Sequence, residues 1–480
     1  MIHHPGAPSG GPMSRRELLK KASMGFGGMV LGSMLTRDAL ADTTLLPVTP
    51  GPLAPRMPHA FGKAKSVIFL YMDGGVSQVD SFDPKPYLDK ADGKAPTFKV
   101  DPTVFNNNGN LKASPWAFKQ YGQSGIPVSD LFPHIGSCAD DLCVIRSMTA
   151  MSPNHPNANY ALHSGHALFG RPSMGAWVSF GMGTLNRNLP SFVVMHGGQV
   201  PSGGMGCFTS GFLPANHQAS VFLPGAPNLQ NVTRKESTPE LQDAKLGMLN
   251  EADRHFLDDH VYADELESSI LNYQLAARMQ MEVPDVLDVT GESDATRRLY
   301  GLDAQYENTR RYGKQCLLAR RLVERGVRFV ELTISGGNGD RWDQHGGLKD
   351  GHQKNAMAVD QPIAGLIKDL KSRGLLDSTL LVFSGEFGRT PFSQGRDGRD
   401  HNPQGFSLWM AGGGIRGGTV YGATDEFGYR AVENKLTVHD LHANMLHLLG
   451  VDHTRLTYRH SGRDIRLTDV HGHIIPEILA

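Results

Sequence analysis

Residues 66–75, which read SVIFLYMDGG, carry the pattern that decides the fold. The run is apolar without a break until it ends in an acid and two glycines. Such a run is typical of a β-strand that is buried on both faces and opens into a loop at its carboxyl end. Similar runs follow along the chain, at residues 142–148, 191–198, 327–335 and 378–388. Together they predict a sheet that is covered on both sides.

Two segments between the later strands are predicted helices. Residues 309–326 and 356–374 place apolar side chains at helical spacing, and each segment ends at Gly. Strands and helices in alternation require crossover connections, which produce parallel strands. We therefore expect an α/β fold with three layers, in which a central, mainly parallel sheet is sandwiched between helices on both faces.

Residues from 200 to about 296 interrupt this alternation. They are polar and rich in Pro, Gly and Asn at first, and then charged, with a helical pattern at residues 251–280. We interpret the segment as an insertion or cap that could shape substrate access. The alternative is that its helices only pack against the core.

The composition is that of a globular protein with no preference for polyanions. The chain has 480 residues, of which 39% are hydrophobic, so it can bury a sizeable core. Lys and Arg number 47 against 48 Asp and Glu, which gives a net charge of -1. This balance argues against general attraction to nucleic acid or to an anionic membrane surface. We expect no nucleic-acid partner.

The N-terminus has the pattern of an export signal. SRRELLKKA carries paired arginines, an uncharged run follows at residues 23–35, and ALA at 39–41 supplies small residues for a signal peptidase. The pattern resembles a twin-arginine signal, which implies export by the twin-arginine machinery to the periplasm or the extracellular space. The apolar run is shorter than the roughly 20 residues of a membrane-spanning helix, so we expect cleavage rather than an anchor. We predict a signal over residues 1–41, a proline-rich linker over 42–65 and a folded domain over 66–480.

The four cysteines receive no chemical role. The sequence has no Cys-x-x-Cys pair, so a cysteine zinc site is not expected. Export permits disulfides, and Cys138 and Cys143 form the closest pair. If these two residues lie at a helix end and a strand start, the geometry would forbid a bond between them.

Acids and histidines follow several of the predicted strands. They are Asp73, Asp343, His345, Glu386 and His401. Because loops converge at the carboxyl ends of parallel strands, we expect these side chains to lie close together. Carboxylate oxygen and imidazole nitrogen are ligands for Zn, Mn or Fe, whereas Ca favours more oxygen. The set predicts a site for one or two divalent metal ions, with Zn, Mn and Ca as candidates.

Each of these residues also has a purely structural interpretation. Asp73 could shape a turn before two glycines, and Asp343 could cap a helix. Glu386 could pair with Arg389, and His401, in a predicted loop over residues 395–405, could face solvent. Their appearance at successive strand ends favours a metal or oxyanion site for the set.

Several motifs give the sequence a family resemblance. They are FLYMDGGVSQVDSFDPKP, HPNANYALHSG, RWDQHGG, FSGEFGRTP, DHNP and GGGIRGGTVYG. As a set they resemble the exported bacterial proteins of the domain of unknown function 1501 (DUF1501) family, over nearly all of the chain from about residue 66. That family looks like a branch of the alkaline phosphatase and sulfatase superfamily. The resemblance implies an alkaline phosphatase-like fold, a metal site at the strand ends, and hydrolysis or transfer of phosphate or sulfate esters.

The resemblance also implies which residues bind metal, and this sequence departs from the pattern of the superfamily in two respects. The implied ligands are Asp73, Asp343, His345, Glu386 and His401. The superfamily usually has Asp followed by His at the late strand end, whereas Phe387 follows Glu386 here, so a second metal site loses a ligand. The pair of Asp343 and His345 is also spaced more tightly than in the phosphatases.

The nucleophile position is a third departure. In sulfatases, a Cys or Ser that is converted to formylglycine begins a motif that ends in Gly. When HPNANYALHSG is aligned with that motif so that Gly165 is its last residue, His155 occupies the position of the Cys or Ser. No Ser, Thr or Cys stands there, which argues against a formylglycine sulfatase. His155 could coordinate metal, could attack as an imidazole, or could leave a metal-activated water as the nucleophile. We prefer water, because it requires no residue that the sequence lacks.

Other polar residues are candidates for supporting roles. His163 could bind a leaving group or hydrogen-bond to a metal ligand, or it could cap the next helix. Arg389 could stabilise an anionic transition state through its planar fork, or it could pair with Glu386. Asp80 and Asp83 could add metal ligands, although turn roles suit them equally.

The sequence thus predicts an exported, metal-dependent hydrolase of phosphate or sulfate esters. We expect a small-molecule or carbohydrate ester as substrate, because an exported enzyme meets such compounds outside the cytoplasm. The alternative is a non-catalytic exported binding protein that retains the fold after losing the nucleophile and a metal ligand. Convergence of the predicted ligands would favour the enzyme, and dispersal would favour the binding protein.

Overall fold

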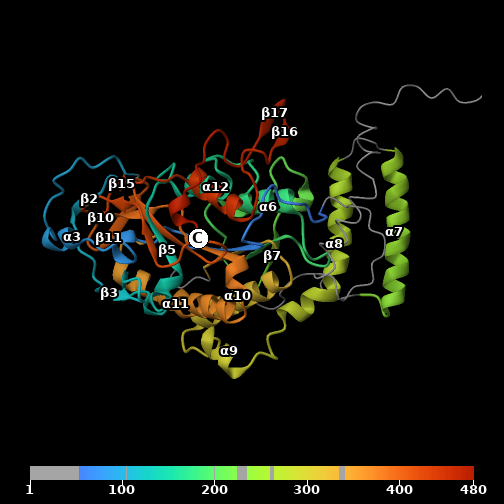
Figure 1. Cartoon of the computed structure of the whole chain (residues 1–480), viewed down its shortest axis with the longest axis horizontal. Coiled ribbons are helices and arrows are strands. Elements are labelled where there is room, and N and C mark those ends of the chain that lie inside the picture. Colours follow the sequence, from blue (N-terminus) through green and yellow to red (C-terminus); the bar gives the residue numbers. More distant parts are fainter. Residues whose placement is uncertain (1–52, 104, 199, 224–234, 260–263, 335–340) are drawn as a thin grey trace, which may run out of the picture. The chain divides into compact units, whose positions relative to one another are not determined.

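The structure, a computed structural model, describes residues 53–480 except 104, 199, 224–234, 260–263 and 335–340 (Figure 1). The chain divides into two units, Met1–Gly51 and Pro52–Ala480, and the elements below all belong to the second. The predicted signal and the linker up to residue 52 lie outside the described residues. The rest of the linker is fastened to the domain, because Ala60 N–H donates to Gly450 O at 2.9 Å and Ala64 N–H donates to Leu448 O at 3.0 Å.

The predicted central sheet is present and has eight strands. In order across the sheet they are β13 (Thr419–Tyr421), β5 (Leu142–Met148), β12 (Phe406–Ala411), β9 (Thr379–Ser384), β1 (Ser66–Tyr71), β8 (Phe329–Thr333), β6 (Phe192–Met195) and β7 (Ser220–Phe222). β12 runs antiparallel to both of its neighbours, and the other pairs are parallel. In β1, Val67 is opposite Phe329 of β8 and Leu380 of β9. The predictions of a mainly parallel sheet and of its apolar strands are confirmed.

Successive side chains of β1 point into two different cores, one on each face of the sheet. Ile68 and Leu70 pack in a core with α10 (Glu307–Glu324) and α11 (Leu348–Ser372). Val67 and Phe69 pack in the other core, with helices α5 (His155–Ser164), α6 (Met174–Met182) and α12 (Val438–Leu448). Figure 1 shows α10 and α11 on one side of the sheet and α6 and α12 on the other. The three-layer α/β sandwich is confirmed, and both predicted helices are present, the second as part of the longer α11.

A second, smaller sheet corrects one prediction. Its strands are β11 (Gly398–Asn402), β10 (Gly388–Gln394) and β2 (Asn108–Leu111). Arg389 of β10 is opposite His401 of β11, so the prediction that His401 lies in a loop is wrong. The polar sequence around His401 has no strand pattern of its own, and antiparallel pairing with β10 supplies the hydrogen bonds that keep it extended.

The segment predicted as an insertion or cap contributes to the core. It contains β7 and the helices α7 (Pro239–Asp259), α8 (Asp264–Leu287) and α9 (Asp294–Leu299). β7 is an edge strand of the central sheet, so the first part of the segment belongs to the middle layer. Val283 and Val286 of α8 are completely buried in the core that contains α10 and α11. A role of this segment in substrate access stays a prediction.

Short elements connect these layers. Among the described residues they are the helices α3 (Pro86–Lys90) and α4 (Pro133–Gly136), the 3-10 helices η1 (Gln78–Asp80), η2 (Ala139–Asp141), η3 (Gly204–Phe208), η4 (Ala215–His217), η5 (Leu376–Ser378) and η6 (Pro476–Ile478), and the paired strands β3 (Phe118–Tyr121) with β4 (Ile126–Ser129), β14 (Ala423–Thr424) with β15 (Ala431–Glu433), and β16 (Tyr458–His460) with β17 (Arg463–Ile465). Within the described part of the chain, no helix has both the length and the apolar character that crossing a bilayer requires.

All four cysteines are buried and free, so no disulfide joins Cys138 to Cys143. Cys138 immediately precedes η2 and Cys143 lies in β5. Burial raises the pKa of Cys143 to about 12 and also raises the pKa of Cys316. A buried thiol with a raised pKa stays protonated at neutral pH.

Candidate metal centre

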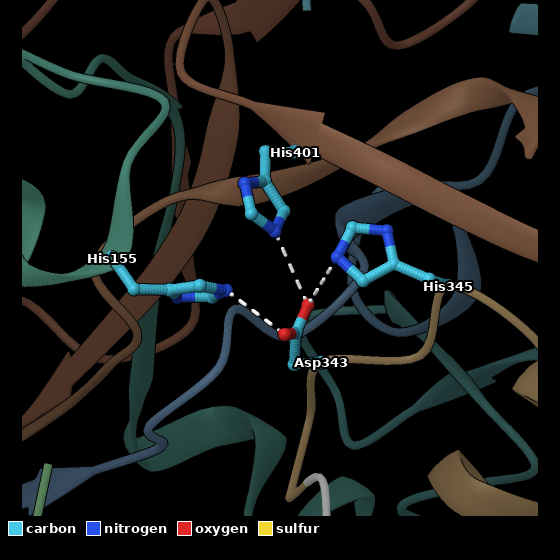
Figure 2. A group of neighbouring side chains, drawn as sticks. All are labelled: His155, Asp343, His345 and His401. Carbon is cyan, nitrogen blue, oxygen red and sulfur yellow. Dashed lines mark hydrogen bonds and ion pairs between the residues drawn. The ribbon is translucent and has the colours of Figure 1, made fainter. Parts of the chain in front are cut away.

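Four side chains from three separate parts of the chain meet beyond the carboxyl ends of the central strands (Figure 2). They are His155, Asp343, His345 and His401, and one ligand atom from each lies within 4.8 Å of the others. His155 is the first residue of α5, Asp343 and His345 follow β8, and His401 lies in β11. No other group of three or more His, Cys, Asp or Glu side chains with such spacing occurs among the described residues. Three of the predicted ligands therefore meet, and His155 joins them.

The local sequence positions these side chains. Pro156 lies in the first turn of α5, where its fixed φ suits a helix and its missing N–H removes no helical hydrogen bond, so the helix can begin at His155. Gly347 adopts a left-handed φ of 63° immediately before α11 and so ends the loop after β8. A Cβ at Gly398 would collide with the backbone carbonyl of His345, so the close approach of β11 to this loop requires glycine.

The three histidines turn the same ring nitrogen, Nε2, toward the carboxylate of Asp343. His345 Nε2 lies 2.9 Å from Asp343 Oδ1, and His401 Nε2 lies 3.2 Å from the same oxygen. His155 Nε2 is buried and lies 3.2 Å from Asp343 Oδ2. Imidazole nitrogens and a carboxylate oxygen that face one point are a ligand set for zinc, manganese or iron. The residues present therefore fit a divalent metal ion.

The other ring nitrogen, Nδ1, of each histidine is bonded away from Asp343. The acceptors are Glu386 Oε1 for His155, at 2.5 Å, Pro153 O for His401, at 2.6 Å, and Gln394 Oε1 for His345. Bonds of this kind orient an imidazole and favour the tautomer with hydrogen on Nδ1. That tautomer leaves the Nε2 lone pair available for a metal ion.

Asp343 carries the negative charge at the middle of the group. Burial alone would raise the pKa of Asp343, but hydrogen bonds from the three histidines and the charge of Arg389 hold that pKa well below its usual range. Bonds to Asp343 and Glu386 likewise outweigh burial and raise the pKa of His155 to about 9. Burial, aided by the charges of Arg389 and His155, lowers the pKa of His401 to about 4. Asp343 is thus the ionised centre of the group, and the surroundings raise the pKa of one neighbouring histidine, His155, and lower that of another, His401.

Two of the predicted metal ligands lie beside this group. Asp73 is 2% exposed, and its carboxylate forms an ion pair with Arg341. Glu386 is also buried and accepts hydrogen bonds from Gly74 N–H and Tyr71 O–H, each at 3.0 Å. Both carboxylates have partners within the protein, and their role as metal ligands stays a prediction.

Arg389 is completely buried and contacts Asp343 from the protein interior. Its Nη2 donates to Asp343 Oδ1 at 2.6 Å and to Gly74 O, and its Nε donates to Gly75 O at 3.1 Å. Its carboxylate partner is therefore Asp343 rather than Glu386. Because these donors are already used within the protein, the geometry suits orientation of Asp343, and direct stabilisation of a transition state stays a prediction.

The remaining polar candidates are bonded within the fold. His163 is buried, with Nε2 at 2.8 Å from Glu331 Oε1 and Nδ1 at 2.7 Å from Asn159 O. A catalytic role for His163 stays a prediction. Asp80 forms a buried ion pair with Arg399, and Asp83 pairs with a lysine, Lys85, at 3.0 Å. These pairs account for Asp80 and Asp83 without a metal ion.

Sequence reasoning missed two residues at the group. Gln394 supplies the acceptor for His345 Nδ1, and Phe105 stands edge-on over the histidines. The ring centroid of Phe105 lies 4.8 Å from that of His345 and 6.1 Å from that of His401, and Phe105 is 57% exposed. Neither residue belongs to a motif, because the β10–β11 hairpin places Gln394 and a loop from a distant part of the chain places Phe105.

Comparison with known proteins gives one family and a set of distant structures. The family described as "Protein of unknown function (DUF1501)" matches residues 64–479. The PsFucS1 sulfatase from Pseudoalteromonas sp. is 14% identical, with 82% of this chain and 68% of that chain covered and a TM-score of 0.36. A protein in the alkaline phosphatase superfamily from Vibrio parahaemolyticus is 11% identical. The match covers 87% of this chain and 74% of that chain, with a TM-score of 0.36. An alkaline phosphatase from the Antarctic bacterium TAB5 is 12% identical. The match covers 74% of this chain and 92% of that chain, with a TM-score of 0.31. No curated protein matches the sequence.

Proposed function

The chain belongs to the DUF1501 family, and from that premise we propose that it is an exported, metal-dependent hydrolase of phosphate or sulfate esters. One observation carries the proposal. His155, His345 and His401 all direct Nε2 at Asp343, while their Nδ1 atoms are bonded elsewhere. Histidines that served only to fill the core would need no common orientation, so the arrangement supports a site for a divalent cation.

Asp343, His345 and His401 would hold the cation, with nitrogen and oxygen donors that suit zinc, manganese or iron. Calcium is less suitable, because it takes roughly six to eight oxygen ligands. When bound, such an ion acts as a Lewis acid and lowers the pKa of water, which supplies a nucleophile at neutral pH. The side chain of Asp343 is 29% exposed, so an ester can approach the group from solvent.

The protein's own side chains would orient the site and move a proton. Arg389 fixes the direction of the Asp343 carboxylate from the interior. His155 comes from a different element, α5, and lies between two carboxylates, at 3.2 Å from Asp343 and 2.5 Å from Glu386. Since three protein ligands with one open position suffice for a catalytic metal, we assign His155 to proton transfer toward the leaving oxygen. The alternative role for His155 is that of a fourth ligand.

A second candidate function is that of a non-catalytic binding protein. It is favoured by the partners of two acids that the sequence assigns to metal: Asp73 is paired with Arg341, and Glu386 is bonded to Gly74 and Tyr71. A protein that has lost part of its catalytic machinery would show such internal pairing. Activity measurements separate the two functions, because a binding protein would retain metal and ligand without releasing phosphate or sulfate.

Elemental analysis of the purified protein tests the proposed metal site. We expect stoichiometric zinc, manganese or iron in the wild type, and its loss in Asp343→Ala and in His401→Ala. His447→Ala is the matched control, because His447 is exposed on α12 and lies outside the group. A wild type that stays free of metal after incubation with Zn, Mn, Fe and Ca would overturn the metallohydrolase.

The role of His155 is tested separately, with phosphate and sulfate esters as substrates. Proton transfer predicts that His155→Ala retains the metal ion but loses most activity toward esters with poor leaving groups. Esters with good leaving groups need little protonation, so their hydrolysis should fall much less. Loss of the metal ion from His155→Ala would instead identify His155 as a ligand.

Export rests on the N-terminal sequence alone. N-terminal sequencing of protein recovered from the periplasm or the medium should give a chain that begins near Asp42, after the ALA motif. Replacement of Arg15 and Arg16 by lysine should keep the chain in the cytoplasm with its signal uncut. Normal export of that variant would contradict the twin-arginine route.

A further inference from the structure

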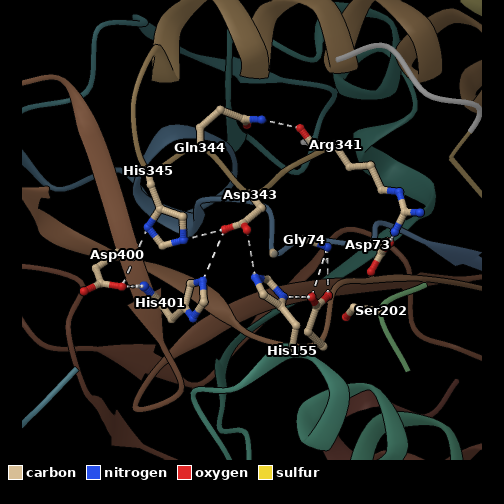
Figure 3. A network of polar contacts seen from close by, with 12 residues as sticks. Asp73, Gly74, His155, Ser202, Arg341, Asp343, Gln344, His345, Asp400 and His401 are labelled. Carbon is tan, nitrogen blue, oxygen red and sulfur yellow. Dashed lines mark hydrogen bonds and ion pairs between the residues drawn. The ribbon is translucent and has the colours of Figure 1, made fainter. Parts of the chain in front are cut away.

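We propose that Arg341 is a built-in cation that takes the place of a second metal ion, so that the centre holds one metal ion per chain. The inference rests on the proposed function, because it concerns the stoichiometry of the same site. It starts from Asp73 and Glu386, which the sequence assigns to metal but which lie outside the group of ligands. Figure 3 shows Asp73 and Arg341 to one side of Asp343, and His345 and His401 to the other.

The ion pair between Asp73 and Arg341 is largely removed from solvent. The two side chains are 3% and 14% exposed, and Arg341 also donates from Nη2 to Val200 O at 2.6 Å. A carboxylate as deeply buried as that of Asp73 needs a positive charge beside it, because desolvation of an unpaired charge is strongly unfavourable. In a metal site that charge comes from the ion, and here the guanidinium supplies it.

The main chain at Arg341 and Trp342 is hydrogen-bonded to neighbouring parts of the fold. The backbone of Arg341 has a positive φ of 54°, which is uncommon for a residue other than glycine. Its carbonyl oxygen accepts hydrogen bonds from the side-chain amides of Gln344 and Asn355. The next backbone N–H, that of Trp342, donates to Asp73 O at 3.2 Å. A backbone hydrogen bond of the residue after the arginine thus joins the two segments whose side chains form the ion pair.

Near Glu386 there are few groups that could bind a second metal ion. Its carboxylate is already bonded to Gly74, Tyr71 and His155. The next residue, Phe387, is completely buried, and its ring centroid lies 4.7 Å from that of His155. An apolar ring therefore occupies space in which another ligand side chain could have stood. With a cation on Asp73 and a hydrocarbon ring after Glu386, a dinuclear centre lacks both charge balance and ligands.

The number of bound ions tests the proposal directly. The probes are Zn²⁺ and Mn²⁺ in calorimetric titration of the metal-free, full-length mature protein, combined with elemental analysis. We expect one ion per chain in the wild type, still one in Asp73→Asn, and none in Asp343→Ala. Two ions in the wild type, or loss of an ion on Asp73→Asn, would overturn the proposal. A wild type that binds no ion would defeat the proposed function itself, so the two failures are distinguishable.

Removal of the guanidinium gives a second test. Arg341→Met removes the positive charge beside Asp73. It should therefore raise the stoichiometry from one to two Mn²⁺ ions per chain, and the second ion should bind more weakly. In Arg341→Met combined with Asp73→Asn the stoichiometry should return to one. A folded Arg341→Met protein that still binds a single ion at millimolar Mn²⁺ would contradict the substitution of a metal ion by arginine. If Arg341→Met does not fold, the numbers of metal ions bound by the wild type and by Asp73→Asn still decide between one metal ion and two.

Discussion

The guanidinium of Arg389 and the carboxylate of Asp343 form an ion pair with 2.6 Å between Nη2 and Oδ1. The Arg389 side chain is completely buried, whereas 29% of the Asp343 side chain is exposed. The pair therefore runs from the protein interior to the open side of the metal centre. Because Arg389 is itself bonded to the carbonyls of Gly74 and Gly75, the end of β1 and the loop after β8 are linked through one side chain.

We predict that Arg389→Lys weakens metal binding by about 10–100-fold, the usual effect of removing a partner that orients a ligand. A lysine has a single nitrogen in place of a planar fork and cannot contact Asp343 and both carbonyls together. Calorimetric titration with Zn²⁺ would measure the change, and circular dichroism would show that the fold is retained. Arg311→Lys is a suitable control, because the Arg311 side chain is 55% exposed. Unchanged affinity in Arg389→Lys would mean that Asp343 is oriented without this contact.

We predict that Arg399→Met destabilises the protein by about 3–5 kcal/mol, because it leaves a buried charge unpaired. Arg399 and Asp80 are both completely buried, and Arg399 Nε lies 2.7 Å from Asp80 Oδ2. Urea unfolding of the metal-free protein would give the free energy difference. The double variant Arg399→Met with Asp80→Asn should recover part of the loss, since neither charge remains. A cost below about 1 kcal/mol in the single variant would show that water replaces the arginine.

The same substitution should disturb the metal centre. Arg399 and His401 lie in β11, so displacement of Arg399 would shift the strand that carries a ligand. We expect Arg399→Met to bind Zn²⁺ more weakly than the wild type, while Arg459→Met, on the exposed β16–β17 hairpin, should bind it normally. Equal affinities would show that β11 is held by its pairing with β10 alone.

The inner strands of the central sheet could be predicted because they are buried on both faces. An uninterrupted apolar run such as that of β1 is visible without knowledge of its neighbours. β11 lacks this signal, since its residues are polar and it is a strand only through its pairing with β10. The sequence pattern therefore identified the buried inner strands, but not the partly exposed edge strands β7 and β13 or the strand that carries His401.

The candidate site was predictable to the extent that its residues lie in motifs. RWDQHGG places Asp343 and His345 after a buried strand, and the structure brings both into the group. The ion pair of Arg341 with Asp73 could not be foreseen, although Arg341 lies in the same motif, because the pair joins residues that are far apart in the sequence. A motif thus indicates which residues gather at a site, and only the three-dimensional arrangement shows which charges cancel.

We predict that part of the acid sensitivity of folding comes from His442. This histidine is completely buried in α12, and burial, together with the charges of His439 and His163, lowers the pKa of His442 from 6.5 to about 3. The unfolded chain then binds more protons than the folded chain between these pH values, so stability is present above pH 6.5 and is lost as pH falls toward 3. The loss from this residue alone should be on the order of 2 kcal/mol by about pH 5.

The measurement is the free energy of unfolding of His442→Gln and the wild type between pH 5 and 7, by urea titration. His442→Gln removes the proton-binding group, so its stability should fall less steeply with acidification than that of the wild type. The matched control is His447→Gln, because His447 is exposed on the same helix. Parallel curves for the wild type and His442→Gln would assign the acid sensitivity to other residues.

The exposed ring of Phe105 should determine how the alcohol part of an ester is bound. Phe105 stands edge-on over His345 at the open side of the metal centre and is 57% exposed. An aromatic face at this position can pack against a sugar ring or an aryl group while the anionic part of the ester reaches the centre. On the proposed function, Phe105→Ala should therefore raise KM about tenfold for esters of bulky alcohols, which corresponds to about 1.4 kcal/mol of binding.

The kinetic pattern distinguishes this role from a structural one. Phe105→Ala should leave kcat nearly unchanged and should not alter hydrolysis of methyl or ethyl esters, which are too small to reach the ring. Phe105→Trp keeps an aromatic face and should retain a low KM, so it is the matched control. Ring packing on His345 is the competing explanation, because a displaced histidine would weaken metal binding and reduce activity toward small and large esters alike. A uniform loss of kcat with all substrates, accompanied by weaker Zn²⁺ binding, would therefore assign Phe105 to support of His345 instead of contact with substrate.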